Sequence, residues 1–231
     1  MKVSVKQGRE AGRVGNAPGN PFVQRVGRYV RSIFCLFILA LPSGTALAQQ
    51  PLFARGPFLA QAAGVTFLEK AGTFQRVDIL TYSRDGKNLS VGYNSTEPTN
   101  PILATIYIYP AGRVLSFGSP RDVVNEAHDR VEQMEMDSVV HEILSAHRGA
   151  QIVRQERGNV AWGGRSLAAL HARFSYAEPF FGKRQRLLGD IWLSTVGKWY
   201  VKYRVTYPAA NASSAMTSVQ RLMKKLPIPA A

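Results

Sequence analysis

Alternation of apolar and polar residues predicts several β-strands in the first half of the folded chain. The Asp85-Gly86 pair is typical of a tight hairpin turn. Further along, the strand ILATIYIY ends at Pro110. β-Branched and aromatic residues are frequent in these segments, as in half-buried strands. The expected strands are residues 65–67, 74–82, 88–93 and 102–109.

The spacing of apolar residues then changes to that of a long helix over residues 119–148. Ser119 precedes Pro120, so we expect the serine hydroxyl to cap the helix and the proline to occupy its first turn. Gly149 is expected to end the helix in a left-handed conformation. The apolar stripe drifts near Asp137, where we expect a bend.

After this helix, alternation returns and indicates an antiparallel meander followed by a short amphipathic helix. The helix covers residues 213–226, and Pro227 ends it. The expected meander strands are residues 150–156, 167–176, 186–196 and 199–207. The two helices are far apart in sequence, so each is expected to lie on the sheet. The predicted fold is therefore α+β: an antiparallel β-sheet with a long central helix and a C-terminal helix packed on it.

The strand ILATIYIYP, the long helix, a Gly-rich step, a meander ending in GKWYVKYRVTYP and a short helix together resemble the PsbP-like fold. This family includes photosystem II extrinsic subunits, eukaryotic Ran-binding relatives and exported bacterial proteins. The resemblance covers most of residues 65–226. It rests on the order of the elements and on the residue pattern of the strands, without a diagnostic motif. It implies a non-catalytic binding or assembly role, and it transfers no functional residue.

The N-terminal pattern predicts a secretory signal peptide over residues 1–48. A basic flank precedes the apolar run IFCLFILAL, and the small-residue triplet Ala46-Leu47-Ala48 follows it. This run is short of the roughly 20 residues that cross a bilayer, so a membrane anchor is not expected after cleavage near Ala48. We then expect a leader segment (49–64), a single α+β domain (65–227) and a tail (228–231), located in the periplasm or secreted.

Charge and cysteine content narrow the expected partners. The chain has a formal net charge of +14, and the chain that follows the signal peptide also carries more basic than acidic residues. A basic protein favours an anionic partner, such as an envelope lipid or an acidic glycan, although a protein partner remains open. Export disfavours nucleic acid as the partner. Cleavage also removes Cys35, the one cysteine, so thiol catalysis is excluded.

The stretch GKWYVKYRVTYP contains part of the candidate binding surface. A two-residue turn at Gly197-Lys198 pairs Val196 with Trp199, which turns the aromatic residues of strand 199–207 toward one face. That face is predicted to be core. The opposite face carries Lys202 and Arg204 beside aliphatic residues.

Further basic residues are expected near this second face. His171 and Arg173 alternate in a similar way on a neighbouring strand, and Arg184 and Arg186 add charge at a strand end. If the strands align, the ligand-binding patch consists of His171, Arg173, Arg184, Arg186, Lys202 and Arg204. The other interpretation is a solvated basic face without a ligand.

The motifs for common catalytic sites are incomplete, so no catalytic residue, metal site or cofactor is predicted. His141 and His147 are six residues apart, whereas a helical zinc site needs histidines four apart, and Ser145 stands at that position. No G-x-S-x-G elbow is present. The favoured function is a non-catalytic binding or envelope-assembly protein. The alternative is an envelope hydrolase, which a deep pocket lined by His171 and acidic residues would favour.

Overall fold

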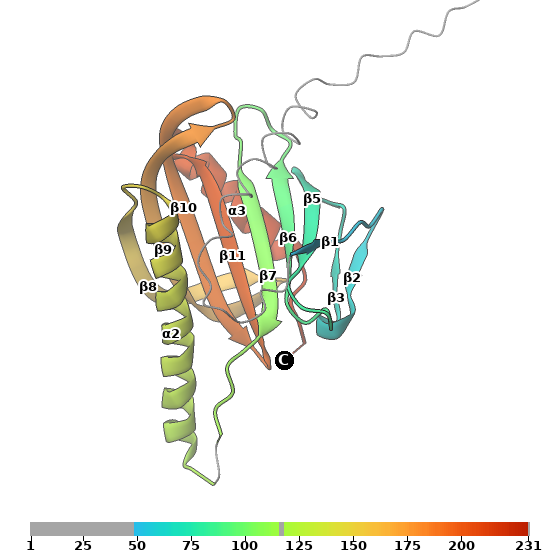
Figure 1. Ribbon diagram of the computed structural model, residues 1–231, viewed down its shortest axis with the longest axis vertical. Helices are drawn as coiled ribbons and strands as arrows, with labels where there is room; N and C mark the ends of the chain where they lie inside the picture. The colour runs from blue at the N-terminus through green and yellow to red at the C-terminus, as the bar shows by residue number, and fades with distance from the viewer. Residues whose placement is uncertain (1–48, 116–117, 231) are drawn as a thin grey trace, which may run out of the picture.

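The computed structural model describes residues 49–115 and 118–230, which form a large antiparallel sheet with helices on it (Figure 1). The predicted α+β fold is confirmed, and the expected signal peptide lies outside the described residues. The sheet order is β1-β5-β6-β7-β11-β10-β9-β8, with β4 beside β5. The strands are β1 (Gln50–Pro51), β4 (Lys70–Ala71), β5 (Phe74–Thr81), β6 (Leu89–Ser95), β7 (Leu103–Pro110), β8 (Gln151–Trp162), β9 (Arg165–Phe180), β10 (Lys183–Val196) and β11 (Trp199–Pro208).

Tight turns set the register of the C-terminal meander. Gly163 and Gly164, with φ of 52° and 77°, turn β8 into β9, a conformation that glycine adopts without strain. The turn at Gly197-Lys198 pairs Val196 with Trp199, as the sequence predicted. The strands of the meander are longer than their apolar segments suggested, since β9 extends to Phe180.

The long helix α2 (Arg121–Ala146) remains helical through Asp137, where a bend was expected. The predicted serine cap is wrong. Pro120 is the N-cap residue, and no side chain caps the first turn. At the other end the helix stops at His147, whose carbonyl accepts a hydrogen bond from the N–H of Ala150 across the left-handed Gly149.

The two long helices cover opposite faces of the sheet, with α2 in front and α3 (Ala212–Lys225) behind in Figure 1. We call these the α2 face and the α3 face. Helix α2 buries Met136, Val139, Val140 and Ile143 against β9 and β10. Helix α3 buries Ala215, Val219, Leu222 and Met223. The α3 face contains the predicted core face of β11, namely Trp199, Val201, Tyr203, Val205 and Tyr207.

The N-terminal part of the described chain belongs to the fold, so the boundary expected at residue 65 moves earlier. A small second sheet pairs β2 (Phe58–Ala60) with β3 (Val65–Phe67), and Ala60 is buried in the core. The buried Arg76 guanidinium donates to the carbonyls of Ala54, Gly56 and Phe67 at 2.7–2.8 Å. These bonds attach the expected leader to β5. Over residues 49–115 and 118–230, no helix has the length and apolar content to cross a membrane.

Candidate functional site

The six predicted site residues lie on two faces of the sheet, so the expectation of one basic patch is wrong. His171 pairs with Trp192, which pairs with Tyr203 of the α3 face. Residues directly opposite each other on neighbouring strands share a face. By the same register Arg173, Arg184 and Arg186 have α3-face positions, whereas Lys202 and Arg204 have α2-face positions.

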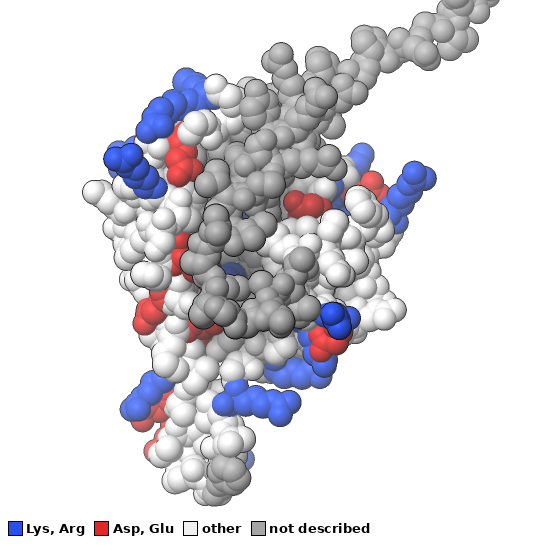
Figure 2. Space-filling view, in the orientation of Figure 1, with Lys and Arg blue, Asp and Glu red and all other residues white. Residues whose placement is uncertain are grey.

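The two α2-face residues make contacts that stabilise the fold. Arg204 Nη2 lies 2.9 Å from His147 Nε2, and His147 Nδ1 lies 2.8 Å from Glu178 Oε1. Lys202 Nζ lies 4.7 Å from the ring centre of Tyr107. In Figure 2, which shows this side, Lys and Arg around the rim are interspersed with Asp and Glu, and no continuous basic patch is visible outside the grey atoms.

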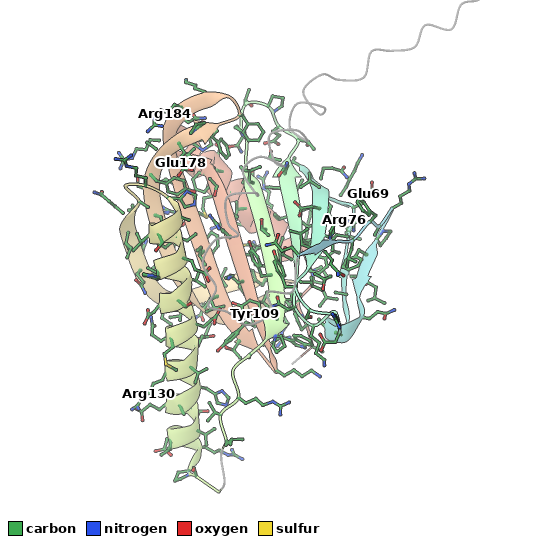
Figure 3. The ribbon with its side chains drawn as sticks, in the orientation of Figure 1. Glu69, Arg76, Tyr109, Arg130, Glu178 and Arg184 are labelled. Atoms are coloured by element: carbon green, nitrogen blue, oxygen red, sulfur yellow. The ribbon has the colours of Figure 1, made fainter. Side chains whose placement is uncertain are left out.

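Arg184 and Arg186 extend the α3 face toward the β9–β10 hairpin. Both are exposed, and Arg186 Nε donates to Ser175 Oγ at 2.9 Å. Arg184 lies at the tip of this hairpin in Figure 3, near Glu178 and far from Tyr109 at the other end of the sheet. These two arginines add positive charge at the hairpin, whereas His171 and Arg173 are part of a more organised site.

The centre of that site is Asp190, a fully buried carboxylate on β10. Three side chains donate to it: His171 Nε2 at 2.7 Å, Arg173 Nε at 2.8 Å and Tyr207 Oη at 2.5 Å. Burial would raise the pKa of Asp190, but these three hydrogen bonds outweigh burial and hold its pKa below the usual value. The carboxylate therefore stays charged and fixes the positions of its donors.

His171 is held on both ring nitrogens. Its Nδ1 lies 3.3 Å from Glu156 Oε1, and its ring stacks on Trp192 with centroids 4.9 Å apart. Arg154 pairs with the same glutamate. An imidazole placed between two carboxylates has no ring nitrogen left to take a proton from a substrate, so its geometry is that of a support.

Arg173 is the group of this cluster that is available to a ligand. Its Nε is bound to Asp190, and its side chain is 26% exposed. Within the described residues, its two η nitrogens have no hydrogen-bond partner. Burial would lower the pKa of Arg173, but the hydrogen bond and charge of Asp190 raise it above the usual value. The guanidinium is thus a fixed cation with donors that remain to be used.

Arg173 opens into a pocket of about 220 Å³ between α3 and β8–β10, which we call the α3 pocket. Gln220 of α3 brings a neutral amide to the walls, and two methionines of the same helix bring flexible apolar surface. The lining residues are Glu156, Gly158, Asn159, Val160, Ala169, His171, Arg173, Trp192, Met216, Gln220 and Met223.

The pocket has no hydroxyl or thiol among its lining residues, so a serine, threonine or cysteine nucleophile is not present there. Among the described residues, no group of three or more His, Cys, Asp or Glu is placed to hold a metal ion. The histidine pair considered for zinc is separated: His147 is buried against Glu178, and His141 is exposed.

The acidic members of the site, and the contact of Tyr207 with Asp190, were not predicted from the sequence. Asp190 alternates with Trp192 and Ser194 on the core-facing side of β10, and an acid at such a position must be paired. That position is the signal that could have found it. The partners on β8 and β9 remained hidden because the register of these two strands relative to β10 was unknown.

Comparisons with known proteins give similar folds only. No protein-family model matches the sequence, and no curated protein matches it. A cyanobacterial PsbP from Synechocystis sp. PCC 6803 is 10% identical, with a TM-score of 0.42, over 83% of this chain and 98% of that one. LpqN of Mycobacterium tuberculosis, described as involved in cell envelope biogenesis, is 11% identical, with a TM-score of 0.39, over 78% and 90%.

A third similar structure is the Ran-binding protein Mog1p of Saccharomyces cerevisiae, 13% identical with a TM-score of 0.29, over 78% of this chain and 87% of that one. The chain resembles a solved PsbP protein in its fold, as the order of its elements suggested. At these identities the likeness concerns the fold, and the activities in those names belong to those proteins.

Proposed function

We propose that this is an exported binding protein that holds a small anion with an apolar tail in the α3 pocket. The observation that carries the proposal is Arg173, a fixed guanidinium with unused η nitrogens at a pocket wall. The basic flank, apolar run and Ala46-Leu47-Ala48 triplet support export.

The residues around Arg173 define the ligand chemistry. A guanidinium matches the two oxygens of a carboxylate or a phosphate, and this one is already oriented by Asp190. Trp192, Met216 and Met223 line the rest of the pocket with apolar surface. The volume of about 220 Å³ suits a short tail and is below that of pockets for drug-sized ligands.

The hydrolase alternative has weaker support. The pocket does contain His171 beside Glu156, which would favour an enzyme. Both ring nitrogens of His171 are hydrogen-bonded to carboxylates, and the lining offers no hydroxyl or thiol nucleophile. A binding function uses the group that is available, Arg173, whereas hydrolysis needs groups that are engaged elsewhere.

Calorimetric titration of the purified protein with hexanoate and with hexyl phosphate tests the proposal. We expect saturable binding of these anions and none of the neutral analogue hexanol. Replacing Arg173 with Gln should abolish this binding, because it removes the charge. Arg165→Gln is the matched control, since Arg165 is exposed at the β8–β9 turn and does not line the pocket.

The pocket can also be filled without removing charge. Gly158 stands opposite Ala169 on the α3 face, and a Cβ there would meet no atom within 4 Å. Gly158→Val should therefore keep the fold and block the ligand. Equal binding of hexanoate by this variant or by Arg173→Gln would contradict the proposal.

The source of the anion is resolved by a second arm of the experiment. Sedimentation with vesicles of anionic phospholipid tests whether the ligand is a lipid headgroup. Binding to vesicles that depends on Arg173 assigns an envelope lipid, whereas binding of soluble anions alone assigns a free metabolite.

A further inference from the structure

The opposite face of the sheet carries a second pocket, of about 410 Å³, between the middle of α2 and the end of β7. We call it the α2 pocket. We infer that it binds a small organic cation of the quaternary ammonium class. Its lining residues are Tyr109, Pro110, Gly112, Val131, Met134, Glu135 and Tyr200.

Two tyrosine rings and a carboxylate meet in this pocket. Tyr109 and Tyr200 are directly opposite each other on β7 and β11, with ring centroids 5.4 Å apart and planes tilted by 55°. Tyr109 Oη donates to Glu135 Oε1 at 2.6 Å. Figure 3 places Tyr109 at the lower end of β7, level with the middle of α2 and above Arg130. Aromatic faces beside a carboxylate are the chemistry that recognises ammonium groups without N–H donors.

The local electric field favours a cation. Burial raises the pKa of the Tyr200 phenol, and the charges of Glu135 and Glu132 raise it further. Burial and Glu135 likewise raise the pKa of Tyr109, so this phenol keeps its proton and donates to the carboxylate. Glu135 is the residue of the lining with a formal charge, so the wall of the pocket carries a negative charge in a protein whose formal net charge is +14.

The neighbouring row of the sheet already holds an ammonium group. Lys202 pairs with Tyr107 and lies 4.7 Å and 5.3 Å from the ring centres of Tyr107 and Tyr109. It does not line the pocket, which lies at the next row, toward the strand end. Burial lowers the pKa of Lys202, and the charges of Glu142 and Glu135 oppose this. Tyr107 and Tyr109 thus hold one cation, the ammonium of Lys202. The pocket beside Tyr109 and Tyr200 is open to a second one.

The remaining walls suit methyl groups on nitrogen. Val131 and Pro110 are apolar, and Met134 is 62% exposed at the rim. Gly112 is needed for the width of the pocket, because a Cβ there would lie 2.6 Å from Val131 Cγ1. A polar lining would favour a hydrated metal ion, whereas this lining favours an organic cation with an apolar surface.

The test compares two ligands of the same shape. Choline and tetramethylammonium are titrated into the purified protein and followed by NMR. The control ligand is 3,3-dimethylbutan-1-ol, in which carbon replaces the charged nitrogen of choline. We expect shifts that saturate with the two cations and not with the neutral alcohol.

The variant Glu135→Gln keeps the size of the side chain and an oxygen for Tyr109, and removes only the charge. It should weaken choline binding about fivefold or more, as expected for losing one charge near the surface. Glu126→Gln is the matched control, since Glu126 is an exposed acid of the same helix that pairs with Arg130. It should leave binding unchanged.

Three results would overturn the inference. The first is equal binding of choline and the neutral alcohol, which would make the pocket merely apolar. The second is the absence of saturable binding by both cations. The third is unchanged choline affinity in Glu135→Gln. The α3 pocket is on the other face, so its anion titration in the same protein reports independently on the proposed function.

Discussion

Asp190 and Arg173 stand directly opposite each other on β10 and β9, and Arg173 Nε donates to Asp190 Oδ1 at 2.8 Å. The aspartate is fully buried, whereas the arginine reaches the α3 pocket. One residue of the pair therefore belongs to the core and the other to the wall of the α3 pocket. Because the buried aspartate holds the Arg173 guanidinium, the orientation of Arg173 depends on an intact core around Asp190.

Replacing Asp190 with Asn is expected to lower the free energy of unfolding by about 3 kcal/mol, because three donors lose a charged acceptor in a buried site. Urea unfolding of the variant and the parent measures this. Asp129→Asn is the control, since Asp129 is exposed on α2 and should change stability little. A parent-like urea midpoint for Asp190→Asn would show that the cluster does not stabilise the fold.

Two buried tyrosines of β11 are expected to respond in opposite ways to the same change. Tyr207 donates to Asp190, so Tyr207→Phe should lower stability by about 1.5–3 kcal/mol. Tyr203 Oη is buried and has no partner among the described residues, so Tyr203→Phe should raise stability by up to about 1 kcal/mol. Thermal melts compare the two variants, and equal effects would contradict the contacts.

Truncating a core aromatic tests the assignment of the α3 face. Tyr203 is fully buried and stacks on Trp162 with ring centroids 4.9 Å apart. Tyr203→Ala should therefore lower the free energy of unfolding by about 3–5 kcal/mol. Thr206→Ala, a partly exposed position of the same strand, provides the comparison. Denaturant unfolding of the two variants measures the difference. A small loss of unfolding free energy for Tyr203→Ala would place the aromatic residues outside the core.

Stability is expected to decrease as the pH falls below about 6.5, because of His147. Burial is the main cause that lowers its pKa below the ordinary value of 6.5, and the Arg204 charge adds to this against the opposing Glu178. The unfolded chain then takes up a proton near pH 6.5, whereas the folded chain does so only at lower pH. Protonation therefore favours the unfolded state between these two values.

Urea unfolding between pH 7.5 and pH 5 measures this dependence. His147→Gln should flatten the pH dependence, and His128→Gln, an exposed residue of α2, should retain it. Stability that stays constant over this range in the parent would show that the folded chain protonates His147 as readily as the unfolded chain.

Export predicts that the processed protein begins at Gln49, immediately after the Ala46-Leu47-Ala48 triplet. Mass spectrometry of protein recovered from a secreting host identifies the first residue. Ala48→Leu removes the small residue at the cleavage position and should leave the longer form uncleaved. Recovery of the parent with residues 1–48 intact in the extracytoplasmic fraction would contradict the prediction.

Local patterns predicted most of the elements and one register. The Gly197-Lys198 turn determined how β10 pairs with β11, so the core face of β11 followed from alternation alone. The position of β9 did not follow, because its turn contains Phe181 with φ of 49°, a conformation rare for a residue other than glycine. The placement of His171 and Arg173 beside Lys202 failed at this step, since a shift by one residue changes the face of every side chain.

Long-range contacts explain the other differences. The segment expected to be a leader is held by the Arg76 guanidinium through backbone carbonyls, which leave no pattern in the sequence. Helix α2 runs through Asp137 because the sheet supports the buried residues on its second half. The α3 pocket combines strands and a helix distant in sequence, so its composition became visible only in three dimensions.

The last strand of the chain, β11, lies in the middle of the sheet, between β7 and β10. The pairing of Tyr109 on β7 with Tyr200 on β11 can therefore form only after β11 has been synthesised. Until then the sheet remains divided into two halves. Folding of this domain is consequently a late event in synthesis, compatible with passage of an unfolded chain through a membrane. A premature stop before β11 removes the centre of the fold, whereas loss of a terminal strand in most proteins only shortens an edge.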